Sequence, residues 1–281
     1  LTITEGSIEV NDSKYTQHKA DGDVTGTIDE TLVIYSDDAT AETENSVVIS
    51  GGTEEQPVRV ALKDVNINRA NTVGTAVMLS NGAYVDMILQ GTNTLRGGNS
   101  AAGLRVAASK NEPISTLNIC QLSTGTLNTY GGSISSDGWG GGAGIGGNVY
   151  ENPGYIIINA GTIYAEGCKG GAGIGGGWKD FFDYGTCPQG KITINGGDIT
   201  AKGSKGEHDE NCPEGIGSLY GNVDVVIAGG NLNATIRYGS TIKDEKGNVI
   251  VRKGFNGLTP DQEITVSQIS AFGNTVTVGK N

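Results

Sequence analysis

The phrase GGAGIGG at residues 141–147 returns as GGAGIGGG at residues 170–177, and a similar partner follows each copy. The partners read YIIINAGTIYAEG at residues 155–167 and KITINGGDITAKG at residues 191–203. Recurrence of a whole phrase together with its partner is typical of repeat proteins, in which each unit stacks on the next. The sequence therefore predicts a stacked architecture before any single residue is interpreted.

A third and weaker round follows as PEGIGS at residues 213–218 and DVVIAGGNLNAT at residues 224–235. Asn195 lies 36 residues after Asn159, and the matching Ala228 lies 33 residues further on. Units of this length are too long for hexapeptide or nonapeptide coils. They also lack the apolar helix of leucine-rich, ankyrin and tetratricopeptide repeats.

Within a unit, apolar and polar residues alternate. Ile192, Ile194 and Ile199 are expected to point inward, with Thr193 and Asn195 between them. The Gly-Gly or Ala-Gly pair in the middle of each phrase indicates a sharp corner that a residue with a Cβ atom would resist. Each unit thus predicts two or three short strands separated by corners, which is one rung of a parallel β-helix.

Asparagines recur near the predicted strand ends, among them Asn118, Asn159 and Asn195. Asparagine side chains favour turns, and identical side chains at the same position of stacked units can form a ladder of amide hydrogen bonds. These residues are expected to cap turns or to form such a ladder between rungs.

The composition suits a single all-β domain. The chain has 47 glycines and 6 prolines in 281 residues, which is rich in turns but neither collagenous nor disordered. Because a stacked coil grows by adding units, we expect one domain over residues 1–281. Residues 1–30 are the expected N-terminal cap, and residues 257–281 the expected C-terminal cap.

The charge of the chain excludes some classes of partner. The net charge is −12 without a cluster of Lys or Arg, which argues against binding to nucleic acid or to an acidic membrane surface. No run of about 20 apolar residues is present, so no membrane span is predicted. The chain opens at Leu1 rather than Met, from which we expect an exported chain whose signal peptide has been removed.

Four cysteines, Cys120, Cys168, Cys187 and Cys212, bear on whether the chain is exported. Cys168 and Cys212 each lie shortly before the glycine-rich phrase of successive units, so we expect a Cys168–Cys212 disulfide, with Cys187 as the competing partner. The spacings are not those of a zinc site.

The run VALKDVNINRANTVGTAVMLSNGAYVDMILQGTNTLRGG at residues 60–98 resembles bacterial surface proteins described as carbohydrate-binding-domain β-helices. The AGIGGG and ITINGGxIxA repeats are similar to those of secreted and wall-attached bacterial proteins, and the resemblance covers roughly residues 47–234. It implies a right-handed parallel β-helix (a β-solenoid) of the pectate-lyase-like type, an extracellular or cell-surface location, contact with polysaccharide, and calcium as a candidate cofactor. The same fold hosts lyases, hydrolases, binders and adhesins, so the activity stays open.

Catalytic residues are not predicted. A polysaccharide lyase of this fold needs a cation and a basic side chain, and a glycosidase needs a pair of carboxyl groups. The acids on predicted strands are isolated, and no acidic pair recurs on successive units. The acids and arginines weighed for such a role are Asp64, Asp86, Asp198, Asp224, Arg59, Arg96 and Arg105.

Aromatic residues gather in the loops beside the glycine-rich phrases. Sugar rings have apolar faces that pack on aromatic platforms, and carboxyl groups beside the platforms bind sugar hydroxyls. The same aromatics can instead fold as a lid over the glycine-rich face, and the two interpretations are compatible. The candidate carbohydrate-binding residues are Trp139, Tyr150, Trp178, Asp180, Phe181, Phe182, Asp183, Tyr184 and Tyr220.

Acidic groups in the loops could hold calcium, which prefers several oxygen ligands. The candidates are Asp180 with Asp183, Glu207 with Asp209 and Glu210, and Asp37 with Asp38. The alternative is an ordinary solvated acidic surface.

Taken together, the sequence predicts a secreted or surface-displayed β-helix that binds polysaccharide or acts as an adhesive module. The alternative is a calcium-dependent polysaccharide lyase or a glycoside hydrolase of the same fold.

Overall fold

The structure is a computed structural model of the chain. It describes residues 1–133, 140–179, 187–204, 215–218 and 223–236, together with the short strands at residues 241–243, 249–251, 268–269 and 275–278. Within these residues the chain is all-β apart from one turn of 3₁₀ helix, η1 (Ile3–Glu5).

The strands form three sheets. Sheet A contains β4 (Leu32–Tyr35), β6 (Val58–Lys63), β9 (Tyr84–Gln90), β12 (Thr116–Ile119), β16 (Tyr155–Ile158), β19 (Gly190–Ile194), β22 (Val223–Ile227), β27 (Thr275–Val278), β24 (Thr241–Lys243) and β25 (Val249–Val251). Sheet B contains β3 (Gly22–Thr27), β2 (Lys14–Lys19), β1 (Gly6–Asn11), β5 (Val47–Ser50), β8 (Val77–Leu79), β11 (Leu104–Ala108), β14 (Ile145–Gly146), β18 (Ile174–Gly175), β21 (Ile216–Gly217) and, beside β11, β15 (Asn152–Pro153). Sheet C contains β7 (Asn66–Asn68), β10 (Thr92–Arg96), β13 (Thr126–Tyr130), β17 (Thr162–Glu166), β20 (Asp198–Lys202), β23 (Asn231–Ile236) and β26 (Gln268–Ile269).

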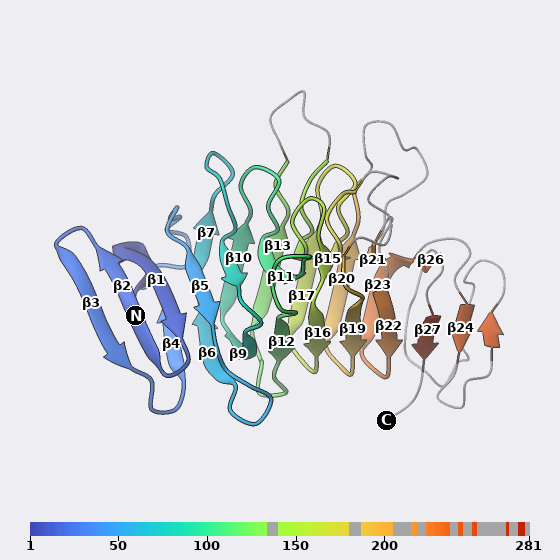
Figure 1. Cartoon of the computed structure of the whole chain (residues 1–281), viewed down its shortest axis with the longest axis horizontal. Helices are drawn as coiled ribbons and strands as arrows, with labels where there is room; N and C mark the ends of the chain where they lie inside the picture. The colour runs from blue at the N-terminus through green and yellow to red at the C-terminus, as the bar shows by residue number, and fades with distance from the viewer. Residues whose placement is uncertain are drawn as a thin grey trace.

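Among the described strands from β6 to β23, the chain visits sheets A, C and B in a fixed cyclic order, apart from β15. We call three successive strands, one from each sheet, a round. Neighbouring strands of a sheet come from neighbouring rounds and pair in parallel, and Figure 1 shows them stacked along the long axis. The sequence repeat is therefore one round, and the prediction of two or three short strands in each unit is confirmed.

The hydrophobic core lies along the inward side of all three sheets as one cluster. In sheet A, for example, Ile119, Ile158, Ile194 and Ile227 occupy the same register on successive strands and are fully buried. Burying each such side chain contributes about 1.5–3 kcal/mol. The predicted alternation is confirmed, because the side chains between these positions remain partly accessible.

The corner between the sheet A and sheet C strands requires glycine. Gly161, Gly197 and Gly230 follow one another on three successive rounds and have φ values of 95°, 91° and 87°. Residues with a Cβ atom rarely adopt this region, whereas glycine does so freely. The corner predicted from the Gly-Gly and Ala-Gly pairs is therefore present.

A second column of glycines explains why the IGG phrase repeats. Gly146, Gly175 and Gly217 stack in sheet B with φ values of 133°, 151° and 129°. A Cβ atom on Gly146 would lie 1.9 Å from the carbonyl oxygen of Gly175, and one on Gly175 would lie 1.7 Å from that of Gly217. No side chain fits there, so the position repeats as glycine.

The asparagines form the predicted ladder. Asn118 Nδ2 donates to Asp86 Oδ1 at 2.7 Å, and Asn159 Nδ2 donates to Asn118 Oδ1 at 2.7 Å. Asn195 Nδ2 continues the series by donating to Asn159 Oδ1 at 2.8 Å. Side chains from four successive rounds are thus linked into one chain of hydrogen bonds.

The two expected caps differ in how far the structure describes them. In residues 1–30, β1 pairs in parallel with β5, and β2 and β3 extend sheet B beyond it by antiparallel pairing. Residues 257–281 lie outside the described residues except for β26 and β27, and β27 pairs in parallel with β22.

Candidate functional site

A groove of about 410 Å³ crosses the outer face of sheet A. Because side chains alternate along a strand, the residues between the buried isoleucines and valines of this sheet point outward. The residues that line the groove and carry its chemistry are Glu54, Tyr84, Thr116, Tyr155, Lys191 and Asp224.

Five of these residues form one row across neighbouring strands, which we call the outer row. Thr116 pairs with Tyr84 on one side and with Tyr155 on the other. Tyr155 pairs in turn with Lys191, and Lys191 with Asp224. Since neighbouring strands lie about 4.8 Å apart, the two tyrosines are separated by about 10 Å and the whole row spans about 19 Å.

The two tyrosines flank a hollow in the groove, and the small side chain of Thr116 lies between them. Thr116 is buried between them, while Tyr155 is 41% exposed and Tyr84 is half-buried. Burial raises the pKa of Tyr84, and the negative charges of Glu54, Asp86 and Glu55 raise it further. Three acidic side chains therefore lie near this end of the groove, with Arg59 4.0 Å from one of them, Asp86.

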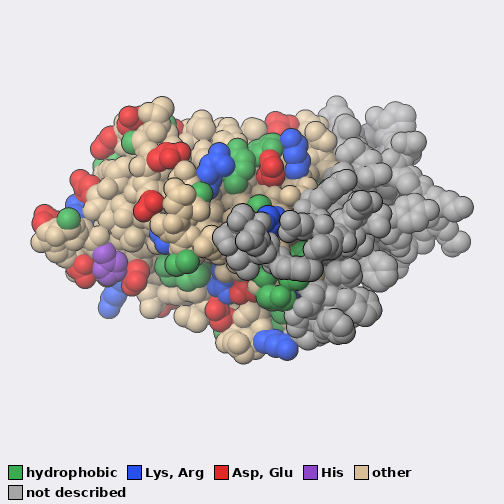
Figure 2. All heavy atoms as spheres, turned by 90° about the horizontal axis from the view of Figure 1, so that it is seen from above, with side chains coloured by type: hydrophobic (Ala, Val, Ile, Leu, Met, Phe, Trp, Pro, Cys, Tyr) green, Lys and Arg blue, Asp and Glu red, His purple; other side chains and the backbone are tan. Residues whose placement is uncertain are grey.

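Charges of both signs border the groove. Glu54 and Asp224 contribute carboxylates, and Lys191 contributes an ammonium group that forms no ion pair with any residue in the described part of the chain. Figure 2 shows one face of the molecule, on which the described basic side chains are dispersed among acidic ones. A groove that combines aromatic rings with single polar groups suits an amphipathic ligand of modest charge.

The two carboxylates of the groove lie near opposite ends of the outer row. Glu54 follows Gly52, which lies against the backbone of Tyr84, whereas Asp224 is at the other end of the outer row. That row spans about 19 Å, but the paired carboxyl groups of glycosidases lie about 5–10 Å apart.

The structure distributes the other acids and arginines weighed from the sequence over separate places. Asp64 accepts a hydrogen bond from Thr92 N at 2.9 Å, so it orders a turn. Arg59 lies 4.0 Å from Asp86, and Arg96 packs over the ring of Tyr130 at 3.9 Å. Of the acids weighed for catalysis, Asp224 is the one that lines the groove.

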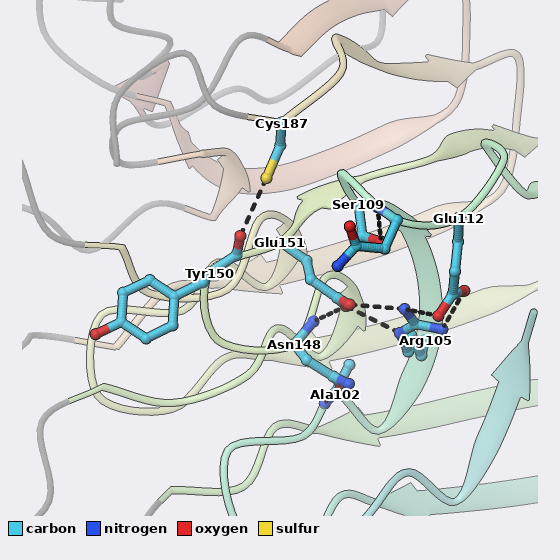
Figure 3. A network of polar contacts seen from close by, with 9 residues as sticks. Ala102, Arg105, Ser109, Glu112, Asn148, Tyr150, Glu151 and Cys187 are labelled. Carbon is cyan, nitrogen blue, oxygen red and sulfur yellow. Dashed lines mark hydrogen bonds and ion pairs between the residues drawn. The ribbon is translucent and has the colours of Figure 1, made fainter. Parts of the chain in front are cut away.

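Arg105 is buried at the centre of a polar network (Figure 3). Its guanidinium contacts Glu151 at 2.9 and 2.6 Å and Glu112 at 3.2 and 3.3 Å. Burial lowers the pKa of Arg105, but the hydrogen bonds and charges of Glu151 and then Glu112 outweigh it, so the pKa is raised and the group stays charged.

This network anchors the loop that carries Tyr150. Glu151 Oε2 also accepts a hydrogen bond from Asn148 N at 3.0 Å, and Asn148 Oδ1 accepts one from Ala102 N at 2.8 Å. The thiol of Cys187 donates to the carbonyl oxygen of Tyr150 at 3.2 Å (Figure 3). A buried arginine with satisfied hydrogen bonds is costly to disrupt, so we assign Arg105 a structural role.

Two of the aromatic residues predicted to bind carbohydrate lie together away from the groove. Tyr150 is 45% exposed, and its ring meets that of Trp178 edge-on at 5.5 Å. The indole packs on Gly140 and Gly170, where a Cβ atom would lie 2.5 and 2.4 Å from it. Trp178 thus covers the glycine-rich face, as the lid interpretation expects.

Apart from Asp37 and Asp38, the other predicted loop residues lie outside the described residues. They are Trp139, Asp180, Phe181, Phe182, Asp183, Tyr184 and Tyr220 and, for calcium, Glu207, Asp209 and Glu210. Within the described residues, no group of three or more His, Cys, Asp or Glu side chains is arranged to hold a metal ion.

The structure describes one of the two cysteines of the expected disulfide, Cys168. Cys168 is a free thiol, as are Cys187 and Cys120, and Cys212 lies outside the described residues. The structure therefore contains neither the predicted bridge of Cys168 nor its alternative with Cys187.

In the described part of the chain, no helix has the length and apolar character needed to cross a bilayer.

Comparison of the chain with protein-family models, with curated proteins and with solved structures found no match.

The sequence reasoning missed the outer row as a site, although its signal was visible. Tyr155, Lys191 and Asp224 are the first residues of the three partner phrases, at the same position of successive rounds. Aligning the phrases brings these residues together.

Proposed function

We propose that this chain binds polysaccharide through the groove of sheet A and acts outside the cell, as a secreted or surface-displayed adhesive module. We further propose that the three sheets close into a right-handed parallel β-helix of the pectate-lyase-like type, which the cyclic order of parallel strands supports. The resemblance of residues 60–98 to carbohydrate-binding-domain proteins agrees with both proposals.

The observation that carries the binding proposal is the outer row. It places two tyrosines about 10 Å apart, with a small floor between them and single charged groups beside them. Aromatic rings pack on the apolar faces of sugars, and the flanking polar groups bind hydroxyls. A glycan chain presents both kinds of surface at once.

Binding to immobilised glycans tests the proposal. The wild-type chain, Tyr155→Ala and the matched control Tyr130→Ala would be compared on a glycan array and in pull-downs with pectin, cellulose and mucin. Tyr130 is a partly buried tyrosine of sheet C outside the groove. We expect Tyr155→Ala to weaken binding about tenfold or more, which corresponds to roughly 1.4 kcal/mol, and the control to bind as wild type.

Two results would count against the proposal. Wild-type protein that captures no glycan contradicts polysaccharide binding, and equal binding by Tyr155→Ala places the site elsewhere, with Tyr150→Ala as the next variant. Incubation with polygalacturonate and calcium, followed by ultraviolet absorbance, checks the alternative lyase activity. We expect no unsaturated product.

A further inference from the structure

We infer that the groove takes an extended, uncharged glycan chain lying along the stack of strands, with one sugar ring on Tyr84 and another on Tyr155. This inference rests on the proposed function and adds the direction, the length and the chemical class of the ligand.

The direction follows from the register. The outer row runs across the strands from Tyr84 to Asp224, so a ligand that contacts the whole row must run along the stack. A chain lying parallel to the strands would meet only one of the two tyrosines. One residue of an extended sugar chain is similar in length to one strand spacing of about 4.8 Å.

The length follows from the same spacing. The outer row covers four strand spacings, about 19 Å in all, which corresponds to about four sugar residues. Tyr84 and Tyr155 are two spacings apart, so they meet alternate rings of the chain. Thr116, which lines the groove between them, has a small side chain, so the intervening ring can lie over it.

The charge of the groove argues against a polyanionic ligand. Two carboxylates, Glu54 and Asp224, face the groove with one ammonium group, that of Lys191. Glu55 and Asp86 add negative charge near Tyr84, although Arg59 lies 4.0 Å from Asp86, and the chain as a whole carries a net charge of −12. A uronate chain would bring a further negative charge with every residue, and like charges repel in this setting.

Uncharged sugars fit the polar groups that remain. Carboxylates accept hydrogen bonds from hydroxyl groups, and such bonds to an ionised acceptor are among the stronger ones. Glu54 and Asp224 would accept from hydroxyls at the two ends of the chain, and Lys191 would donate to a hydroxyl or ring oxygen.

Calorimetric titration tests the inference. The probes are cello-oligosaccharides of two to six residues and their manno- and xylo- counterparts, compared with oligogalacturonates of equal length, in calcium-free buffer and with added calcium. We expect an uncharged hexasaccharide to bind at least tenfold more tightly than the hexagalacturonate. Affinity should rise with length until about four residues, as the spacing of the row requires.

A double variant isolates the role of charge. Glu54→Gln with Asp224→Asn should reduce the discrimination against the uronate to less than threefold. The matched control, Glu9→Gln with Asp23→Asn, removes the same amount of charge from exposed side chains of β1 and β3 outside the groove. This control should retain the full discrimination against the uronate. Thermal melting verifies that both variants are folded.

The outcomes separate the inference from the proposed function. Tighter binding of the uronate, a requirement for calcium, or an affinity independent of length would overturn the inference. If other glycans still bind and depend on Tyr155, the proposed function then stands. Absence of any Tyr155-dependent glycan binding overturns the proposed function itself.

Discussion

The amide ladder allows a quantitative test, because Asn159 takes part in three hydrogen bonds through one side chain. Its Nδ2 donates to Asn118 Oδ1 at 2.7 Å and to the carbonyl oxygen of Ile119 at 3.1 Å, and its Oδ1 accepts from Asn195 at 2.8 Å. Each bond contributes roughly 1 kcal/mol net of solvation. The side chains are partly exposed, so water replaces some of the loss, and we expect Asn159→Ala to cost about 2 kcal/mol.

Urea unfolding followed by circular dichroism measures this cost. The midpoint should fall while the slope of the transition stays constant, which indicates a change in stability alone. The matched control is Asn231→Ala, since the Asn231 side chain is exposed and donates one bond, to Asp198 at 2.8 Å. Exposed interactions contribute little, so we expect a loss below about 0.5 kcal/mol for the control.

A double variant, Asn159→Ala with Asn195→Ala, tests whether the residues act as a ladder. Its cost should be smaller than the sum of the two single costs, because one of the bonds is removed in both. Equal losses for Asn159→Ala and Asn231→Ala, or strict additivity of the double variant, would refute the reasoning.

Three further predictions follow from the buried contacts. Arg105→Met should lower the free energy of unfolding in urea by about 3–5 kcal/mol, because it leaves Glu151 without its cation. Replacing Glu151 with Leu in the same variant should recover part of this loss. An unfolding midpoint equal to that of the wild type for Arg105→Met would contradict a structural role. Gly175→Ala should abolish soluble expression, since the new Cβ would lie 1.7 Å from a carbonyl oxygen. The control Gly22→Ala also has a positive φ but nothing within 4 Å of the new Cβ, so it should express. The pair separates the steric clash from the strain of a positive φ. Burial raises the pKa of Cys120 from 9.0 to about 11. At pH 8 the thiolate fraction of Cys120 should therefore be about 100-fold below that of an ordinary thiol, and iodoacetamide should label it correspondingly more slowly, as measured by peptide mass spectrometry. Labelling of the folded chain as fast as that of the chain unfolded in urea would disprove this.

The repeat made the interior of this fold predictable. Ile192 and Ile194 are buried as their alternation indicates, and Gly197 forms the corner because the chain needs a positive φ there. Asn159 lies beside Asn195 in the ladder because identical positions of a repeat meet when the units stack. These properties depend only on local pattern and on stacking.

The groove was less predictable, because it depends on residues that the phrases do not share. Tyr84 and Thr116 belong to rounds whose sequences differ from the later repeats, and Glu54 comes from a loop beside β6. Which outward positions form a hollow is decided by register and by neighbouring loops. The sequence pattern instead drew attention to aromatic loop residues such as Trp178, which packs on glycines.

The cyclic order of strands also has a mechanical consequence. In the described part of the chain, the strands of each round pair with those of the rounds before and after it, and these hydrogen bonds point along the stack. Tension applied between the ends should therefore peel the rounds off one after another, as in other repeat arrays. A unit of 33 or 36 residues releases roughly 110–130 Å of chain. A molecule held at both ends should therefore lengthen in steps under load and keep its remaining rounds folded.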